Sequence, residues 1–508
     1  MDEGVIHAQR WLTLFHSLFA AGNQGTFALS AHCHCGDEFG CEQNLSEKSW
    51  TKSLKSGMES FRKRTIVLKR LQMDFITHVQ ERMLAQLAEI MAEYEGAVNA
   101  ASLSEMETTV KQMTHQVGNE VLRQWLEAQD QQYPDDERPC PHCEQVAKYV
   151  RRRSGMIISL QGRIYYRRTY YGCEHCQRGH YPLDQRLDIQ AGEMSQQVVK
   201  LAGLLGVQDA FGCSSDLLAR TTLLELSPNS IRKACQQIGD AVLESEQRLI
   251  AESQQLDVQL ERQRAPDKPQ RLYGSMDGFY VLLDTGWHEM KAGAWWQVDA
   301  AGKAQHMRYY VDTTRAEAFS DLVWATGFDQ QADQAQELIF VADAAEWIWN
   351  IVEHHYPQAV QIVDWYHACQ YLTPIATAAF KHPDQRDAWY EQVRTNLWLG
   401  QLDAVIAACQ ALVNPRLARE DDPAQQALTY YRNNRHRMDY PTYRDKDYQI
   451  GSGTMESACK QLGTARLKIA GARWSQAGAR KVAKARATYL SDDWDNLTLS
   501  SQPLPQVA

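Results

Sequence analysis

Three strand-like segments of this sequence carry or end in an aspartate, and this pattern constrains the fold more than any other feature of the chain. Asp277 lies inside an apolar and aromatic run, 272–283, that is typical of a buried strand. Burying a carboxylate there is costly unless it meets a cation or another partner. Two later apolar runs end directly before Asp343 and Asp364. We interpret Asp277 as a ligand of a cation, because no helix cap is available in the middle of a strand.

The predicted elements around these acids follow the order of a ribonuclease-H-like α/β core. Three strands come first, then helices alternate with strands; the strands are predicted at 272–283, 287–298, 305–311, 338–342 and 359–363, and the helices at 315–327 and 346–355. The first part of the core is therefore assigned to 271–364. An all-helical insertion is predicted at 365–450, and a basic C-terminal core helix at 451–490, with Glu456 near its start.

Two Cys-x-x-Cys pairs precede this core and predict a zinc ribbon at 136–190. The first pair is Cys140 and Cys143, and the second is Cys173 and Cys176. Tetrahedral zinc takes four thiolates, and each pair supplies two of them from one tight turn. Strand-like runs at 156–160 and 163–171 lie between the pairs and predict the hairpin that a ribbon requires. One structural Zn²⁺ is expected.

The remaining segments are assigned from periodicity and composition. A helical arm is predicted at 61–135 and a helical domain at 191–253, which is either helix-turn-helix-like, with Ser227 as the cap of its last helix, or a plain helical hairpin. We predict a linker at 254–270, an uncharacterised leader at 1–60 and a polar tail at 491–508. The crowded Cys and His residues at 32–41 match no zinc template. No apolar run is long enough to span a bilayer, so no membrane partner is expected.

Two stretches of the sequence are strongly basic, although the formal net charge of the whole chain is −10. The stretch 145–172 holds seven Lys or Arg residues and no acid, and 451–490 holds eight against the single acid Glu456. Each run is either a solvated face or a surface for phosphates. The candidate DNA contacts in these runs are Arg151, Arg152, Arg153, Arg163, Arg167, Arg168, Lys460, Arg466, Lys468, Arg473, Arg480 and Lys481.

Carboxylates on neighbouring strands suit Mg²⁺, which prefers hard oxygen ligands, and two such ions can activate the nucleophile and stabilise the leaving oxygen of phosphodiester transfer. Asp277, Asp343 and Glu456 are the predicted ligands of two Mg²⁺ (or Mn²⁺) ions. Asp343 could instead cap the helix that follows it, or do both. Asp364 and His367, three residues apart at a strand-to-helix junction, either orient a ligand or serve as a helix cap and a surface residue.

Four motifs together resemble the DDE transposases of bacterial insertion sequences, most closely the ISKra type, which is similar to the ISLre type and distantly to the Mutator group. They are Met276-Asp277-Gly278, the run 341–348, Val363-Asp364-Trp365-Tyr366-His367 and the run 451–457. The likeness covers roughly 75–492. It implies a catalytic triad of Asp277, Asp343 and Glu456 and an Asp-x-x-His signature at Asp364 and His367.

The resemblance also implies partners and a location. The expected partner is double-stranded DNA, as terminal inverted repeats and as target, bound by a homo-oligomer of two or more copies in the bacterial cytoplasm at the nucleoid. Two alternatives stay open. The chain could be a catalytically silent, domesticated DNA-binding protein, or a metal-dependent nuclease without strand transfer.

Overall fold

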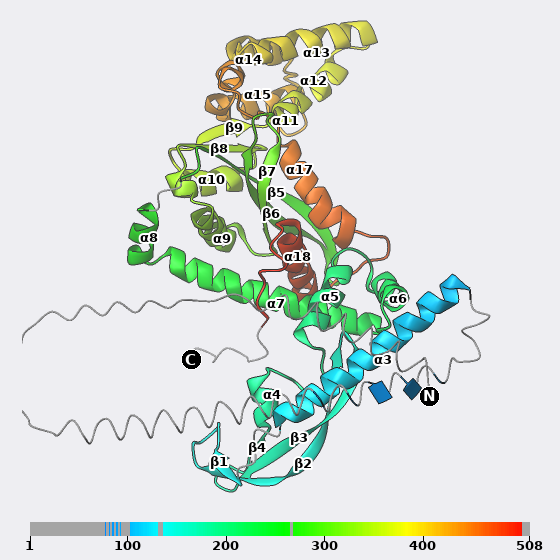
Figure 1. The fold of residues 1–508 in the computed structure, drawn as a ribbon. Coiled ribbons are helices and arrows are strands. Elements are labelled where there is room, and N and C mark those ends of the chain that lie inside the picture. Colours follow the sequence, from blue (N-terminus) through cyan, green and yellow to red (C-terminus); the bar gives the residue numbers. More distant parts are fainter. Residues whose placement is uncertain are drawn as a thin grey trace, which may run out of the picture. The chain divides into compact units, whose positions relative to one another are not determined.

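The computed structural model describes residues 102–130, 136–264 and 268–499, together with isolated helical positions between 77 and 92 (Figure 1). All of them belong to one unit of the chain, Phe75–Ala508. The predicted leader at 1–60 lies outside the described residues, as do most of the predicted arm before 102 and the tail from 500 onwards.

A long helix and a small antiparallel sheet form the first described part. Helix α3, Leu103–Asp130, packs on a sheet in the order β1-β2-β3-β4, whose strands are Glu137–Pro139, Val146–Ser159, Gly162–Cys173 and Gly179–His180. The hairpin β2–β3 runs from the pair Ala147↔Cys173 to its turn at Ser159↔Gly162, which confirms the predicted hairpin. The buried carboxylate of Asp130 accepts hydrogen bonds from the Thr169 backbone N–H and hydroxyl, at 2.9 and 2.7 Å, and so attaches the end of α3 to β3.

Five helices connect this sheet to the core. They are α4 Pro182–Arg186, α5 Gln196–Gly206, α6 Phe211–Thr221, α7 Pro228–Ser253 and α8 Leu256–Gln263. The Ser227 side chain accepts the N–H of Ser230 and Pro228 opens α7, so the predicted start of this helix is confirmed. Helix α8 lies within the stretch 254–270 that the sequence predicted as a linker.

The second sheet has five strands of mixed direction. Its order is β7-β6-β5-β8-β9, from Ala304–Asp312, Gly286–Val298, Arg271–Leu283, Glu337–Ala342 and Val360–Val363. Strands β5, β6 and β7 form an antiparallel meander, whereas β8 and β9 run parallel to β5. The chain is thus an α/β protein, and each predicted strand of this sheet lies within two residues of its observed bounds.

Helices cover both faces of this sheet. Neighbouring side chains on a strand point to opposite faces, so Trp295 and Trp296 of β6 mark the two faces. Helices α9, Ala316–Asp329, and α10, Glu346–His355, lie on the face of Trp295, whose Nε1 donates to the Thr326 hydroxyl at 3.0 Å. Trp296, on the other face, donates to the Gln449 side chain at 3.1 Å. A short 3₁₀ turn, Ala332–Gln334, leads from α9 into β8.

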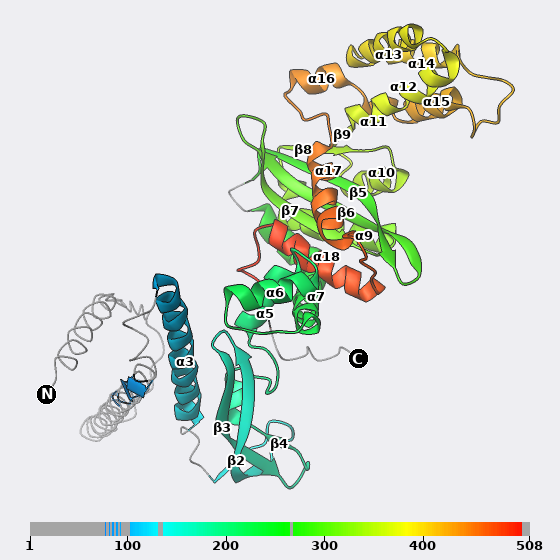
Figure 2. The same ribbon diagram turned by 90° about the vertical axis from the view of Figure 1, so that its right-hand side faces the viewer.

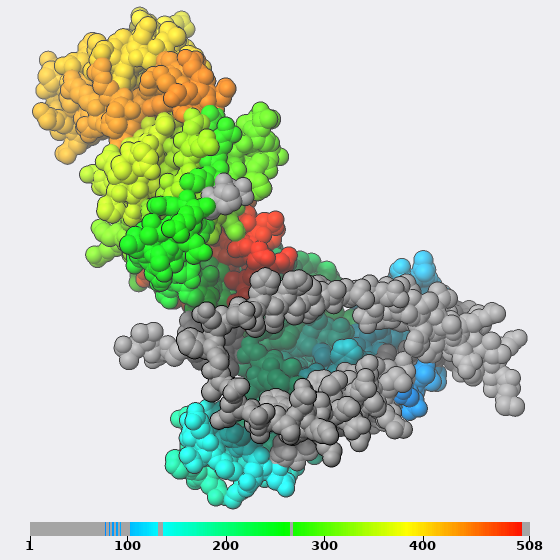
Figure 3. All heavy atoms as spheres, turned by 60° about the vertical axis from the view of Figure 1, so that its left-hand side comes forward, coloured from blue at the N-terminus to red at the C-terminus, as the bar shows by residue number. Residues whose placement is uncertain are grey.

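The segment after β9 is helical, as predicted. Its helices are α11 Trp365–Gln370, α12 Leu372–Ala379, α13 Pro383–Trp398, α14 Leu402–Gln410, α15 Pro423–Asn433 and α16 Tyr440–Asp445, with a 3₁₀ turn at Arg435–Arg437. The Trp365 N–H donates to the Ile450 carbonyl at 2.9 Å, so the insertion leaves and rejoins the core at one place. Figure 3 shows its yellow and orange atoms adjoining the light-green atoms of the sheet segment.

The C-terminal segment is broken into three pieces, which corrects the prediction of one helix at 451–490. Helix α17, Gly453–Cys459, continues as a π-helical stretch, Lys460–Leu467, and α18 begins again at Gln476 and ends at Leu490. Gly471, with φ +77°, and the N-cap Ser475 explain the interruption and the restart. Helix α17 packs on β5 and β6, and α18 packs on α7 and β7 (Figure 2). Among the described helices, none has both the length and the apolar composition needed to cross a membrane.

Candidate functional site

The strand register places three aspartates next to one another at one edge of the five-stranded sheet. The last pair between β5 and β8 is Gly274↔Phe340, and three further residues lead to Asp277 on one strand and Asp343 on the other. The last pair between β8 and β9 is Ala342↔Val363, directly before Asp343 and Asp364. Strands β8 and β9 end directly before Asp343 and Asp364, whereas β5 continues past Asp277 to Leu283, so the three residues follow one another across the sheet at the end of β8 and β9.

The pKa of Asp277 shows how closely these groups lie. Burial raises this pKa from its ordinary value, the N–H of Gly278 lowers it through a 2.7 Å hydrogen bond, and the charge of Asp343 raises it again. The net shift is upward. Burial is the largest cause of this shift, and the nearby charge of Asp343 adds to it because a like charge disfavours the ionised form.

A cysteine links the helix of Glu456 to Asp277. Cys459 lies one turn after Glu456 on α17, and its thiol lies close enough to the Asp277 carboxylate for each group to shift the pKa of the other. Burial, and then the charge of Asp277, raise the pKa of Cys459, so the thiol stays protonated. Glu456 itself is partly exposed, and its carboxylate lies 3.5 Å from the Lys460 ammonium. The helix therefore brings the third acid to the edge that carries Asp277 and Asp343.

Asp343 has a local partner and also lines a cleft. Its Oδ1 accepts the N–H of Ala345 at 2.9 Å, but Ala345 is itself the N-cap of α10, so Asp343 does not cap this helix as the sequence had allowed. It also borders a cleft of about 670 Å³ between the sheet edge and the helical insertion. The cleft is further lined by His367, Tyr371 and Tyr430, among others.

Asp364 is a structural cap rather than an exposed ligand. It is fully buried, and its two carboxylate oxygens accept the N–H groups of His367, at 2.6 Å, and of Ser452. His367 is half-buried, lines the cleft, and lies close enough to Asp277 to lower that pKa by its charge. Asp364 thus fixes the position of both the histidine and the start of the segment that carries Glu456.

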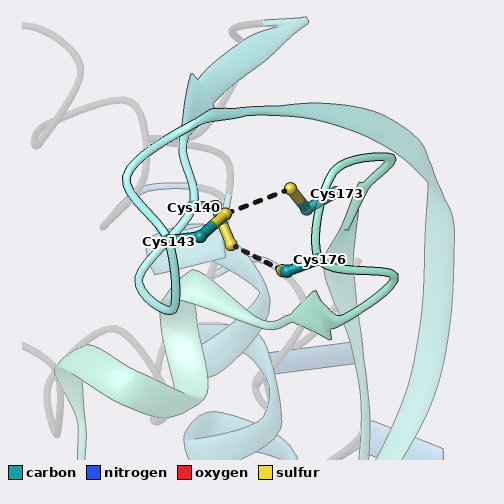
Figure 4. A group of neighbouring side chains, drawn as sticks. All are labelled: Cys140, Cys143, Cys173 and Cys176. Carbon is teal, nitrogen blue, oxygen red and sulfur yellow. Dashed lines mark hydrogen bonds between the residues drawn. The ribbon is translucent and has the colours of Figure 1, made fainter.

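The four cysteines of the ribbon form the second candidate site (Figure 4). Two sulfur pairs, Cys140 with Cys176 and Cys143 with Cys173, are 3.6 Å apart, and all four sulfurs lie within 4.8 Å of one another. A tetrahedral zinc with bonds of about 2.3 Å would separate its sulfurs by about 3.8 Å. The backbone N–H of Cys176 hydrogen-bonds to the sulfur of Cys173, and this is the largest cause that lowers the pKa of Cys173 to about 7. The cluster can therefore hold a metal ion such as zinc.

Across the described part of the chain, this cysteine cluster is the one group of three or more His, Cys, Asp or Glu side chains whose atoms are gathered closely enough for a metal ion. Asp277, Asp343 and Glu456 lie on adjoining elements, but their oxygens do not form such a group.

The predicted DNA contacts fall into three groups. Arg151, Arg163, Arg167, Lys460, Lys468 and Arg473 are exposed. Four residues have partners within the chain: Arg152 lies 3.4 Å from Asp130, Arg153 stacks on Tyr170, Arg480 pairs with Asp312 at 2.7 Å and Lys481 pairs with Asp240 at 2.7 Å.

Arg168 and Arg466 are buried, which corrects their prediction as surface contacts. Arg168 pairs with the buried Asp184 at 2.8 Å, and Arg466 donates from Nε to the Gly206 carbonyl at 2.7 Å. Both guanidinium groups are therefore withdrawn from the open surface, although Arg466 also lines a cavity.

Sequence reasoning missed two residues of the carboxylate site, Cys459 and Ser452. Cys459 had a usable signal, since residues three apart on a helix lie on the same face and Glu456 precedes it by three. Ser452 acts through its backbone N–H, a group that nearly every residue type carries, so its identity gave no signal.

Comparison with known proteins identifies relatives along most of the chain. Residues 97–497 match the model of the uncharacterised protein family UPF0236. One curated relative, a UPF0236 protein of Caldanaerobacter subterraneus subsp. tengcongensis, is 21% identical over 419 residues, which cover 80% of this chain and 84% of the relative. A second UPF0236 protein of the same strain is 22% identical over 394 residues, covering 76% and 78%. The chain therefore belongs to the uncharacterised protein family UPF0236.

Proposed function

We propose that this chain is a DDE-type DNA transposase, which binds the ends of its own insertion sequence and catalyses metal-dependent cleavage and strand transfer. The observation that carries the proposal is the placement of Asp277 and Asp343 side by side on neighbouring strands, with the helix of Glu456 packed on the strand of Asp277. The sheet order β7-β6-β5-β8-β9 supports a ribonuclease-H-like core, because three antiparallel strands precede two parallel ones.

The donor set fits Mg²⁺ or Mn²⁺. Asp277, Asp343 and Glu456 offer hard oxygen ligands, and a divalent cation would favour the ionised form of Asp277, whose pKa is raised first by burial and then by the charge of Asp343. Two such ions, when bound, activate the attacking oxygen and stabilise the leaving oxygen. Asp364 and His367 are proposed to position this edge, and they are not metal ligands in this scheme.

The ribbon supplies a second part of the proposed activity. A structural Zn²⁺ held by Cys140, Cys143, Cys173 and Cys176 would fix the end of the β2–β3 hairpin. The exposed side chains of Arg151, Arg163 and Arg167 on this hairpin are suited to DNA phosphates. We propose that double-stranded DNA binds there, and that two or more copies of the chain assemble on it.

The name of one relative supports a mobile gene. That UPF0236 protein of Caldanaerobacter carries eleven locus designations in a single strain. A protein encoded at many loci of one genome is expected when its gene copies itself or moves. This chain would then act on the DNA flanking its own gene in the cytoplasm, at the nucleoid.

The test is strand transfer by the purified full chain with Mg²⁺ and the DNA ends that flank its gene. Joined products support the proposal. Cleavage without joining would indicate a nuclease, and binding without cleavage would indicate a silent DNA-binding protein.

Variants identify the catalytic groups. Asp277→Asn, Asp343→Asn and Glu456→Gln should each abolish cleavage and joining, because each removes a charge that holds the metal, while DNA affinity stays within about threefold. Asp321→Asn, an exposed acid on α9, is the matched control and should retain full activity. Full activity of the Asp277→Asn protein would overturn the proposed mechanism.

A further inference from the structure

A cavity of about 390 Å³ lies where the loop before α18 meets helices α6 and α7. Its wall contains three arginines, Arg232, Arg466 and Arg473, and no acidic residue. The cavity is therefore a concave site with an excess of positive charge, in a chain whose formal net charge is −10.

Arg466 is the unusual group in this wall. Only 1% of its surface is exposed, and its guanidinium lies over the rings of Phe211 and Trp474, at 4.6 and 5.1 Å from their centroids. Its Nε donates to the Gly206 carbonyl, but its buried NH2 group has no hydrogen-bond partner. Burial lowers the pKa of Arg466 to about 10. A buried cation with an unused donor is costly unless an anion completes it.

A helix cap alone does not account for this arginine. The Nε bond to Gly206 lies at the C-terminal end of α5, where a cation is favourable. Arg486 already serves that end through the Val207 carbonyl. The nearby Asp209 uses its carboxylate on the N–H of Ala210 and does not line the cavity. Within the described part of the chain the buried NH2 group of Arg466 thus has no hydrogen-bond partner, and Arg466 is one of the residues that line the cavity.

Two further features favour an anion in the same place. Helix α18, Gln476–Leu490, begins at the cavity, and its N-terminal end carries partial positive charge. Arg473 is exposed, and its Nε lies 3.8 Å from the carboxylate of Asp284, a weak surface contact that an incoming anion can replace. Arg232 is half-buried and bonds to neutral amide oxygens of Asn229 and Gln236. The positive charges of Arg232 and Arg473 are therefore not fully neutralised within the chain and can attract an anionic ligand.

We propose that this cavity is a phosphate-binding site, which receives one backbone phosphate of DNA between Arg466, Arg473 and the start of α18. The DNA source of the phosphate rests on the proposed function, whereas the affinity for phosphate does not. The site is attached to the catalytic strand, because the Trp474 carbonyl accepts the N–H of Asp284 at 2.8 Å and the Trp474 N–H donates to Leu282. Leu282 lies five residues after Asp277, or roughly 17 Å along β5. A phosphate held here would set the distance between the bound duplex and the carboxylate edge.

The first experiment needs no DNA and no Mg²⁺. The melting temperature of the full chain is measured in sodium phosphate and in sodium chloride of equal ionic strength. Phosphate should raise it for the wild type and for the control Arg435→Gln, which changes an exposed arginine of the insertion. Arg473→Gln and Arg466→Met should each reduce the phosphate affinity derived from this shift by about tenfold or more, since each removes a charge-assisted contact. If Arg466→Met does not fold, Arg473→Gln and Arg232→Gln decide the result. Equal shifts in all variants, or no shift in the wild type, overturn the site.

The second experiment identifies the source. Single phosphates in the end of the element are replaced by uncharged methylphosphonates, scanned over about ten base pairs from the cleavage point. One position should weaken wild-type binding by about tenfold and leave the binding of Arg473→Gln unchanged, because the variant no longer reads that charge. A phosphate shift without any such position would assign the cavity to free phosphate and overturn the DNA source. If phosphate raises the melting temperature but no strand transfer occurs, the phosphate site stands and the proposed function is overturned. If strand transfer occurs but phosphate causes no shift, the proposed function stands and the phosphate site is overturned.

Discussion

The carboxylate of Asp364, at the end of β9, accepts the backbone N–H of Ser452, at the start of the segment that carries Glu456. These two residues lie on opposite sides of the helical insertion in the sequence, yet they are adjacent in the structure. The same carboxylate accepts the N–H of His367. One buried side chain therefore holds together three parts of the candidate site.

Replacing Asp364 should slow the proposed reaction through geometry. Asp364→Ala leaves two buried N–H groups without acceptors, at a cost of about 1–3 kcal/mol each in the free energy of unfolding. Asp364→Asn keeps one acceptor and should cost less. We expect partial loss of strand transfer in Asp364→Asn, with unchanged Mg²⁺ dependence, measured as initial rates at several Mg²⁺ concentrations. A shift of the Mg²⁺ requirement by more than tenfold would instead make Asp364 a metal ligand.

The cysteine cluster should hold one metal ion per chain. Elemental analysis of the purified protein is expected to find stoichiometric zinc in the wild type and in Cys213→Ser, which changes an exposed cysteine outside the cluster. Cys143→Ser and Cys173→Ser should lose it, because a structural site needs four ligands. A chelator should lower the melting temperature of the wild type toward that of these two variants. Full zinc content in Cys173→Ser would contradict the assignment.

Two arginines of the same strand should behave differently. Arg168→Ala leaves the buried Asp184 carboxylate without its cation and should destabilise the fold by about 3–5 kcal/mol. Arg163 is exposed, so Arg163→Ala should leave stability within about 0.5 kcal/mol. The Arg163 variant should instead weaken DNA binding and reduce the slope of log affinity against log salt by about 1. Urea unfolding and a salt titration of DNA binding measure the two effects, and equal stability of both variants would argue against a structural role for Arg168.

Stability should fall in mild acid because of His355. Burial, and then the charge of His354, lower the pKa of His355 from 6.5 to about 4; the ring stacks on Trp324 and contacts the Ser320 hydroxyl at 2.8 Å. The unfolded chain binds a proton near pH 6.5 while the folded chain does not, so stability is lost as the pH falls from 6.5 toward 4. Because the ring is partly exposed and solvent screens its charge, the loss is on the order of 1–2 kcal/mol. Urea unfolding at pH 7 and pH 5 should show a smaller loss in His355→Gln than in the wild type, and an unchanged loss in the exposed-site control His382→Gln. Identical pH profiles for the wild type and His355→Gln would rule out this cause.

The sequence predicted the sheet well and the side-chain environment poorly, for physical reasons. Local apolar and aromatic runs predict the strands of the core, and Ser227 followed by Pro228 predicts a helix start. Both signals depend only on residues that are neighbours in the sequence. Arg168 and Arg466 look alike in the sequence, as two cations in basic runs. Their burial depends on Asp184, Phe211 and the Gly206 carbonyl, the last of which lies 260 residues away from Arg466.

The break after α17 was unpredictable for a related reason. The stretch 451–490 does contain the signals of the interruption, Gly471 and the cap Ser475, but neither announces the switch to π-helical turns at Lys460–Leu467, a stretch that packs on β5 and α18. The convergence of Asp277 and Asp343 could be anticipated from their positions relative to two strands. The approach of Cys459 to Asp277 could not, since it depends on the rotation of α17 about its axis.

The hydrogen bond between Trp365 and Ile450 also bears on the order in which the protein is made. On a ribosome, β5, β8 and β9 emerge before the insertion, and Glu456 emerges only after the insertion has returned to its starting point. A partly synthesised chain can assemble two acids of the proposed triad but not the third. Under the proposed function, completion of the polypeptide would act as a timing control, because nascent fragments would lack the third acid of the triad.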